Sequence, residues 1–273
     1  MKLGIKQALI IFILIIIAVA GSLYIRSKLK VLEPGEIASR QSQHFDVYFY
    51  EIDSKVVDDV IKAGEENYSR ITSNLGYDPE RRIEIHIHHS RKSFTKAVGA
   101  QLPSWSVSAV KDGKIFIQSP YTYLKLNDQG YYDIFGIVPH EFTHLLTWEI
   151  LTEKGTKSIQ QIPAWFIEGI AYHEANQISQ NDLEKLKADY EKGSIMSIED
   201  LQTIPGSKPV ARQYQRQSGW LIRYLSEQYG EDSIRELMEH LSQGRNFNDS
   251  LILTYSLSQI ELDYEWKNFL KTQ

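Results

Sequence analysis

The stretch "VPHEFTHLLTWEI", residues 138–150, is the most informative part of the sequence. Two histidines, His140 and His144, stand four positions apart, and Glu141 directly follows the first. On a helix, positions i and i+4 lie on one face, so both imidazoles can reach one ion. Glu141 is rotated by about 100° from His140, which suits a general base beside the ion. The stretch predicts a zinc-binding helix, but a pattern this short needs support from the rest of the chain.

A third zinc ligand is expected, because catalytic zinc usually has three protein ligands and a water. The segment "IPAWFIEGIAYHEA", residues 162–175, offers Glu168 inside an apolar run, on a helix whose first turn can hold Pro163. A carboxylate buried there is costly unless a cation or hydrogen bonds compensate it. The alternative is that Glu168 points to solvent on an amphipathic helix. Gly169 is a poor residue inside a helix, so it indicates a close approach by a facing helix.

The two motifs "HEFTH" and "PAWFIEGIA", residues 140–144 and 163–171, resemble those of gluzincin metallopeptidases. Most of residues 43–273 is similar to the peptidase MA-like domains found in bacteria. The resemblance implies one zinc ion per chain, held by His140, His144 and Glu168, with Glu141 as the general base. Two departures weigh against an aminopeptidase: 23 residues separate His144 from Glu168, and Ile167 stands where aminopeptidases have asparagine. Neither departure affects the predicted zinc site.

A tyrosine donor to the oxyanion is also implied. Related gluzincins use a tyrosine from the lobe that follows the zinc ligands, and Tyr214 occupies a similar place. It precedes an apolar run, residues 220–225, so we expect it near the start of an inward-packing helix. The alternative is a partly buried tyrosine that braces this helix.

Other potential ligands rank below these. His86 and His88 share one face of a predicted strand, next to His89, and could bind a second ion, but a polar sheet face explains them more simply. The other possible third ligands are two glutamates after His144 and two residues after Glu168. Glu149 and Glu153 are too close to His144 on one helix to fold back onto its metal. His173 should face away from the site, and Glu174 is a weak reserve ligand.

The pattern of elements predicts an α+β fold. Residues 45–51 and 82–89 alternate as strands, and residues 54–76 read as a helix with Ser54 as N-cap and Gly76 as its end. Residues 105–119 predict a hairpin, because Asp112-Gly113 suits a type I′ turn. From Tyr131 onward the chain is mainly helical. We therefore expect a small N-terminal sheet with one helix packed on the zinc helix, followed by a helical lobe.

Pro139 is an irregular feature of the predicted zinc helix. Proline lacks an N–H and clashes with the preceding turn, so it must either start the helix or bend it. We expect a helix from about Tyr132 with a bend.

The N-terminus predicts a membrane segment. Residues 8–25 carry no charge and span roughly 27 Å as a helix, close to the thickness of a bilayer core. We expect a retained single-pass anchor after a flank of residues 1–7. The alternative is a cleaved signal peptide, since Ala18-Val19-Ala20 has the small-x-small pattern. Residues 26–42 then form a juxtamembrane linker and residues 43–273 the domain, which we expect outside the cytoplasm.

Composition excludes several classes of site. The chain has 273 residues and a net charge of -5, which argues against a nucleic-acid surface. It has no cysteine, which excludes disulfides, cysteine nucleophiles and thiolate zinc sites.

We therefore expect a membrane-anchored zinc metallopeptidase that hydrolyses peptide bonds with a zinc-activated water and Glu141 as base. Its partners would be protein or peptide substrates, which could pair with a sheet edge at residues 105–110. Two alternatives are a non-catalytic membrane-anchored binding module on a peptidase scaffold and a zinc amidohydrolase acting on a non-peptide amide.

Overall fold

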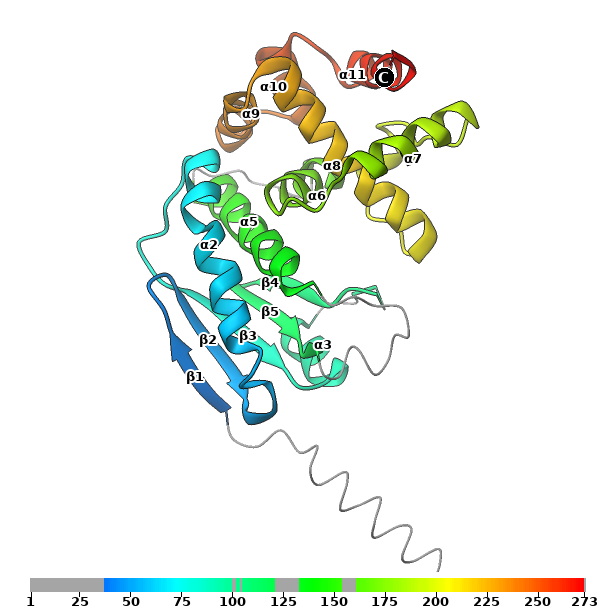
Figure 1. Cartoon of the computed structure of the whole chain (residues 1–273). Helices are drawn as coiled ribbons and strands as arrows, with labels where there is room; N and C mark the ends of the chain where they lie inside the picture. The colour runs from blue at the N-terminus through cyan, green and yellow to red at the C-terminus, as the bar shows by residue number, and fades with distance from the viewer. Residues whose placement is uncertain (1–36, 100–101, 104, 121–132, 154–160, 273) are drawn as a thin grey trace, which may run out of the picture.

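The computed structural model describes residues 37–99, 102–103, 105–120, 133–153 and 161–272. A sheet-containing part comes first, and a helical part follows (Figure 1). The strands are β1 Ile37–Gln41, β2 Phe45–Tyr50, β3 Ile83–His88, β4 Ser108–Lys111 and β5 Lys114–Gln118. The helices are α2 Val57–Leu75, α3 Arg91–Val98, α5 Ile134–Glu153, α6 Ala164–Glu174, α7 Gln180–Glu191, α8 Lys208–Tyr229, α9 Asp232–Ser242, α10 Phe247–Tyr255 and α11 Gln259–Thr272.

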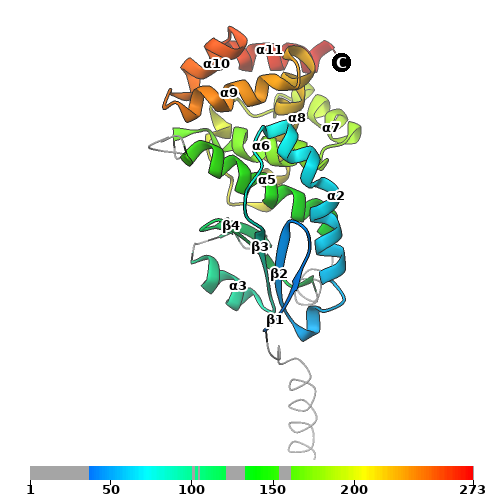
Figure 2. The ribbon, with the colours of Figure 1, turned by 90° about the vertical axis from the view of Figure 1, so that its left-hand side faces the viewer.

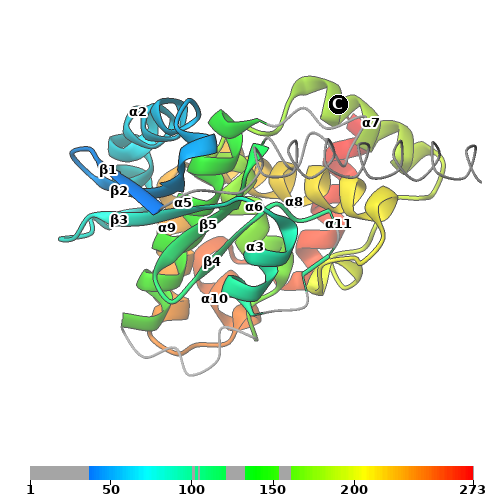
Figure 3. The same cartoon turned by 90° about the horizontal axis from the view of Figure 1, so that it is seen from below.

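The five strands form one mixed sheet in the order β1-β2-β3-β5-β4, which can be followed in Figure 3. Strands β2, β3 and β5 are parallel, while β1 and β4 are antiparallel to their neighbours at the two edges. Alternate residues of the inner strands are buried, and they share one face because side chains alternate along a strand. These buried residues are Phe45, Val47, Phe49, Ile83, Ile85, Ile87, Ile115 and Ile117.

Helices cover both faces of the sheet. The buried strand residues belong to a core that they share with α2 and α5, which includes Ile71 and Phe142. On the opposite face lies α3 (Figure 2). Its Phe94 ring lies edge-on to the ring of His88, with the ring centres 6.4 Å apart. The sheet thus supports α5, the helix that was predicted to bind zinc.

The hairpin between β4 and β5 is confirmed. Asp112 and Gly113 both have positive φ, 50° and 68°, as a type I′ turn requires. This turn fixes the register in which Ser108 pairs with Ile117. It therefore decides which side chains of β4 face the zinc helix.

The helical part is built around the contact between α6 and α8. A Cβ atom on Gly169 would lie 2.5 Å from the Ser218 carbonyl oxygen of α8, closer than real contacts allow. The expected approach of a facing helix at Gly169 is confirmed. Because Gly169 directly follows Glu168, this close packing also fixes the position of the predicted third ligand.

Three local predictions are corrected. Strand β1 lies within the region predicted as a linker, because its polar sequence forms an edge strand paired with β2. Ser54 is not an N-cap: residues 51–53 form a short 3-10 helix, and α2 begins at Val57. The structure also contains α3, which was not predicted.

The ends of three helices can be compared with the predictions. Gly76 ends α2 with a φ of 69°, as expected. Pro163 is the N-cap of α6 rather than a residue of its first turn. Helix α5 begins at Ile134 and continues through Pro139. The Thr143 hydroxyl donates a hydrogen bond of 2.8 Å to the Pro139 carbonyl.

The predicted anchor, residues 8–25, lies outside the described residues, as does most of the predicted linker. Within the described ranges, no helix combines the length and the apolar character needed to cross a bilayer.

Candidate metal centre and active site

Two adjacent helices place three potential metal ligands together. His140 and His144 come from α5 and Glu168 from α6, and their ligand atoms all lie within 4.8 Å of one another. The two histidine Nε2 atoms lie 3.7 and 3.5 Å from the Glu168 carboxylate oxygens. In a tetrahedral site with bonds of about 2.0–2.1 Å, ligand atoms are about 3.4 Å apart. The two distances from the histidines to Glu168 are close to the spacing that a tetrahedral zinc ion requires.

Burial determines the charge state of this group. Burial lowers the pKa of His140 to about 4 and that of His144 well below its usual value, so both imidazoles are neutral. Burial raises the pKa of Glu168 to about 8, and repulsion from Glu141 contributes to this rise. Neutral imidazoles are the form that binds metal, and a buried carboxylate needs a cation nearby. The electrostatics of the site are those of a divalent-cation site.

Glu141 lies beside the three ligands, and a hydroxyl from the sheet contacts it. Burial raises the pKa of Glu141 to about 7, while a hydrogen bond from Ser108 lowers it. The Ser108 Oγ atom donates to Glu141 Oε1 at 2.7 Å. A carboxylate with a pKa near neutrality can both accept and release a proton at physiological pH. Sequence reasoning missed Ser108, because nothing in its local pattern marks it as part of the site.

Gln177 orients His140, the first of the predicted metal ligands. Its Oε1 atom lies 2.8 Å from His140 Nδ1, so Nδ1 donates this hydrogen bond and Nε2 is left for the metal. Gly136 makes room for the contact, because a Cβ atom there would lie 2.7 Å from Gln177 Nε2. Sequence reasoning also missed Gln177, which follows the end of α6 and belongs to neither motif.

Two tyrosines lie near the site. Tyr214 is on α8, near its start as predicted, and is 1% exposed. Its hydroxyl is within electrostatic reach of Glu168, but the residue does not line the cavity at the metal group. Tyr172 does line that cavity, and its ring centre lies 4.7 Å from that of His140. The role of Tyr214 therefore stays a prediction, and Tyr172 becomes a second candidate for the oxyanion donor.

A cavity of about 520 Å³ opens at the metal group. Its floor includes His140, His144, Glu141 and Glu168, and one wall is formed by β4 and the residues before it. Another part of the wall is apolar and includes Trp148, Ile162 and Ile167. Since β4 is an edge strand of the described sheet, an extended chain could add to it within the cavity.

The alternative metal ligands considered from the sequence contact residues outside the metal group. Glu149 pairs with Arg81. His86 is stacked between the rings of Tyr48 and Phe116 and contacts Glu84, which matches a polar sheet face. Glu153 is the last residue of α5.

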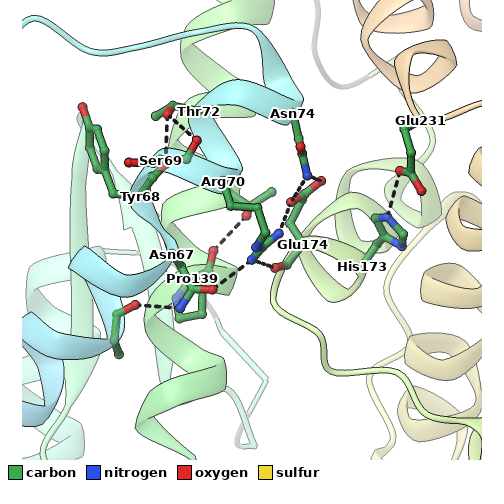
Figure 4. A network of polar contacts seen from close by, with 12 residues as sticks. Asn67, Tyr68, Ser69, Arg70, Thr72, Asn74, Pro139, His173, Glu174 and Glu231 are labelled. Carbon is green, nitrogen blue, oxygen red and sulfur yellow. Dashed lines mark hydrogen bonds and ion pairs between the residues drawn. The ribbon is translucent and has the colours of Figure 1, made fainter.

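Glu174 and His173, at the end of α6, contact residues away from the metal group (Figure 4). The Glu174 carboxylate accepts a 2.6 Å hydrogen bond from Arg70 and also bonds to Asn74, both on α2. His173 lies 3.7 Å from Glu231. Glu174 is therefore no ligand of the metal group. Through these bonds it connects α6, the helix that carries Glu168, to α2 of the sheet-containing part.

Comparison with known families gives one match. The family model described as Peptidase MA superfamily matches residues 63–272, which is well over half of the chain and includes both motifs. No curated protein matches the chain.

Proposed function

Because the chain belongs to the Peptidase MA superfamily, we propose that it is a zinc-dependent metallopeptidase that hydrolyses peptide bonds. The observation that carries the proposal is the close grouping of His140, His144 and Glu168, within 4.8 Å, with Glu141 buried beside them. A metal ion held only for structure would need no buried carboxylate next to its ligands. This residue therefore weighs against a non-catalytic binding module.

The residues around the ligands have distinct chemical roles in this proposal. Zinc, when bound, would supply a Lewis acid that lowers the pKa of a water and polarises the scissile carbonyl. Glu141 accepts the proton of the attacking water and delivers it to the leaving amine. Ser108 holds the Glu141 carboxylate in place, and Gln177 holds His140 in the tautomer that presents Nε2. A tyrosine hydroxyl, from Tyr172 or Tyr214, donates to the oxyanion.

The shape of the cavity favours a peptide over a small non-peptide amide. A strand edge borders it along β4, and a main chain in extended form could hydrogen bond to that edge. The apolar wall at Trp148, Ile162 and Ile167 would accommodate a hydrophobic side chain next to the scissile bond.

Two variants of the full-length protein test the proposal. Glu141→Gln should keep stoichiometric zinc and lose hydrolysis of a fluorogenic peptide library, because the base is lost and the ligands remain. His144→Ala should lose both zinc and hydrolysis. Elemental analysis and product detection by mass spectrometry give the two readouts. Near-native turnover by Glu141→Gln would contradict the mechanism, and stoichiometric zinc in His144→Ala would place the metal elsewhere.

We further propose that residues 8–25 anchor the protein in the cell membrane, with the domain outside the cytoplasm. The support is the uncharged sequence of this segment, which is long enough to span a bilayer. Protease added to intact cells should digest the domain, and the membrane fraction should contain the uncleaved N-terminus. A mature protein that begins at Gly21 would instead indicate a signal peptide.

A further inference from the structure

A second cavity, of about 370 Å³, adjoins the cavity at the metal group. The two cavities share Tyr172, Gln177 and Gln215 as wall residues. Gln177 is hydrogen bonded to His140, and Tyr172 is in ring contact with it. The second cavity therefore begins one side chain beyond a predicted zinc ligand. A peptide advances about 3.3 Å per residue when extended, so a substrate cleaved at the zinc could reach this cavity within about two residues.

The second cavity is positively charged, although the chain as a whole is acidic. Lys185, Arg212 and Arg216 line it, against one carboxylate, Asp182. Asp182 accepts hydrogen bonds from the Ser179 backbone and hydroxyl at the start of α7, and its other oxygen lies 3.7 Å from Lys185 Nζ. A chain of net charge -5 thus concentrates three cationic side chains beside its predicted active site.

The arginines of this cavity have unused hydrogen-bonding capacity. Arg216 is only 3.7 Å from Asp189 through Nη2, and its buried Nε has no partner among the described residues. Arg212 makes no ion pair or hydrogen bond with any residue that the structure describes. Arg212 is exposed, so its lack of a partner is ordinary for a solvated charge. Arg216 also lines the cavity, and its buried Nε–H without a partner indicates a missing acceptor. Guanidinium groups bind carboxylates through two parallel hydrogen bonds.

We propose that this cavity is a carboxylate-binding subsite, which selects substrates with a carboxylate within about two residues of the cleaved bond. The inference rests on the proposed peptidase function, whose substrate it narrows to an acidic class. The carboxylate could belong to an aspartate or glutamate side chain, or to the free C-terminus of the substrate. Both sources present the same group to Arg212 and Arg216.

The test measures binding, so that it does not depend on turnover. Full-length, zinc-loaded Glu141→Gln protein is titrated into fluorescent, N-acetylated neutral heptapeptides, and binding is followed by anisotropy. In one series, a single glutamate is moved along a C-terminally amidated peptide, and each member is compared with its glutamine partner. In a second series, the same neutral peptide is compared as free acid and as amide. The first series reports a side-chain carboxylate and the second a C-terminal one.

We expect one member of either series to bind about tenfold more tightly than its uncharged partner, as a charge-assisted hydrogen bond predicts. In the Glu141→Gln background, Arg212→Gln should remove most of this preference, and Arg212→Gln/Arg216→Gln should abolish it. The matched control is Lys192→Gln, which removes one exposed positive charge from the end of α7 without touching either cavity, and which should leave the preference intact. Melting temperatures verify that all variants fold.

The outcomes separate this proposal from the proposed function. If every charged and uncharged pair binds within about twofold, or no peptide binds, the subsite is overturned. A preference that persists in Arg212→Gln/Arg216→Gln also overturns it. The wild-type protein is tested in parallel for cleavage of the same peptides. Cleavage without charge preference refutes the subsite alone, whereas a charge preference in binding without any cleavage refutes the peptidase function and leaves the subsite standing.

Discussion

The pKa of Glu141 depends in part on one hydrogen bond, which the Ser108 hydroxyl donates. The Ser108 hydrogen bond stabilises the charged form of this carboxylate and opposes the rise in pKa that burial causes. The protonated form cannot accept a proton, so activity should fall as pH decreases through the pKa of Glu141.

Ser108→Ala should therefore shift the acidic limb of the kcat/KM profile to higher pH. Losing the hydrogen bond raises the pKa of Glu141, so the base is protonated over a wider range. The loss of activity should be largest at low pH and small well above the limb. Ser108→Thr keeps a hydroxyl and should restore the profile. An unchanged limb in Ser108→Ala would show that this hydroxyl does not tune the base.

The choice between Tyr172 and Tyr214 is also a question of single residues. Both tyrosines lie within electrostatic reach of Glu168, but only Tyr172 lines the cavity and also lies within reach of Glu141. We expect Tyr172→Phe to lower kcat by about 10²-fold, with little change in KM or zinc content. The kcat, KM and zinc content of Tyr214→Phe are measured under the same conditions. If Tyr214→Phe gives the larger loss of kcat, the original prediction for Tyr214 is right and the assignment to Tyr172 is wrong.

At the scale of elements, the helices that hold the metal ligands were predictable because both motifs are local. His140 and His144 are one turn apart, and Glu168 stands out as an acidic residue in an apolar run. Ser108 and Gln177 could not be predicted in the same way. They reach Glu141 and His140 from 33 and 37 residues away, and only the packing of the fold brings them there. Strand β1 was missed because its polar residues show no alternation of buried apolar side chains. Helix α3 was missed because it is only eight residues long, although Phe94 and Val98 lie at helical spacing.

The contact between α6 and α8 gives an element-scale prediction. In Gly169→Ala, the new methyl group would meet the Ser218 carbonyl and the Ile222 side chain at 2.5 and 2.7 Å, so α6 must shift. We expect destabilisation of about 1–3 kcal/mol in urea unfolding, together with weaker zinc binding, because Glu168 moves with its helix. Gly206→Ala is the control, since a Cβ atom there meets nothing within 4 Å. Equal stability of the two variants would contradict the close packing.

At the scale of the whole molecule, the α+β arrangement and the order of its two parts could be predicted, since strand and helix periods change near Tyr131. The way the two parts are joined could not. Glu174, considered only as a reserve ligand, instead bonds to Arg70 and Asn74 on α2. A carboxylate on an amphipathic helix end carries no sign of which distant helix it will meet.

Removing the metal should weaken the whole domain, because the ligands join α5 to α6 through the ion. A ligand at about 1,000 times its Kd adds about 4 kcal/mol of stability. A strong chelator should therefore lower Tm by on the order of 10 °C, and added zinc should restore it. Differential scanning calorimetry gives the measurement. His144→Ala should show no response to chelator, and an equal response in that variant would mean that zinc stabilises the protein from another site.

Ser108 lies on the β4–β5 hairpin, whereas the predicted zinc ligands lie on α5 and α6. Zinc content and catalytic activity of a purified sample can therefore be lost independently. We expect a preparation whose hairpin has been clipped by a contaminating protease to retain its full complement of zinc while turnover is lost. A measurement of zinc content alone would not detect the damage in such a sample. Specific activity per bound zinc is the quantity that distinguishes a correctly assembled preparation from a damaged one.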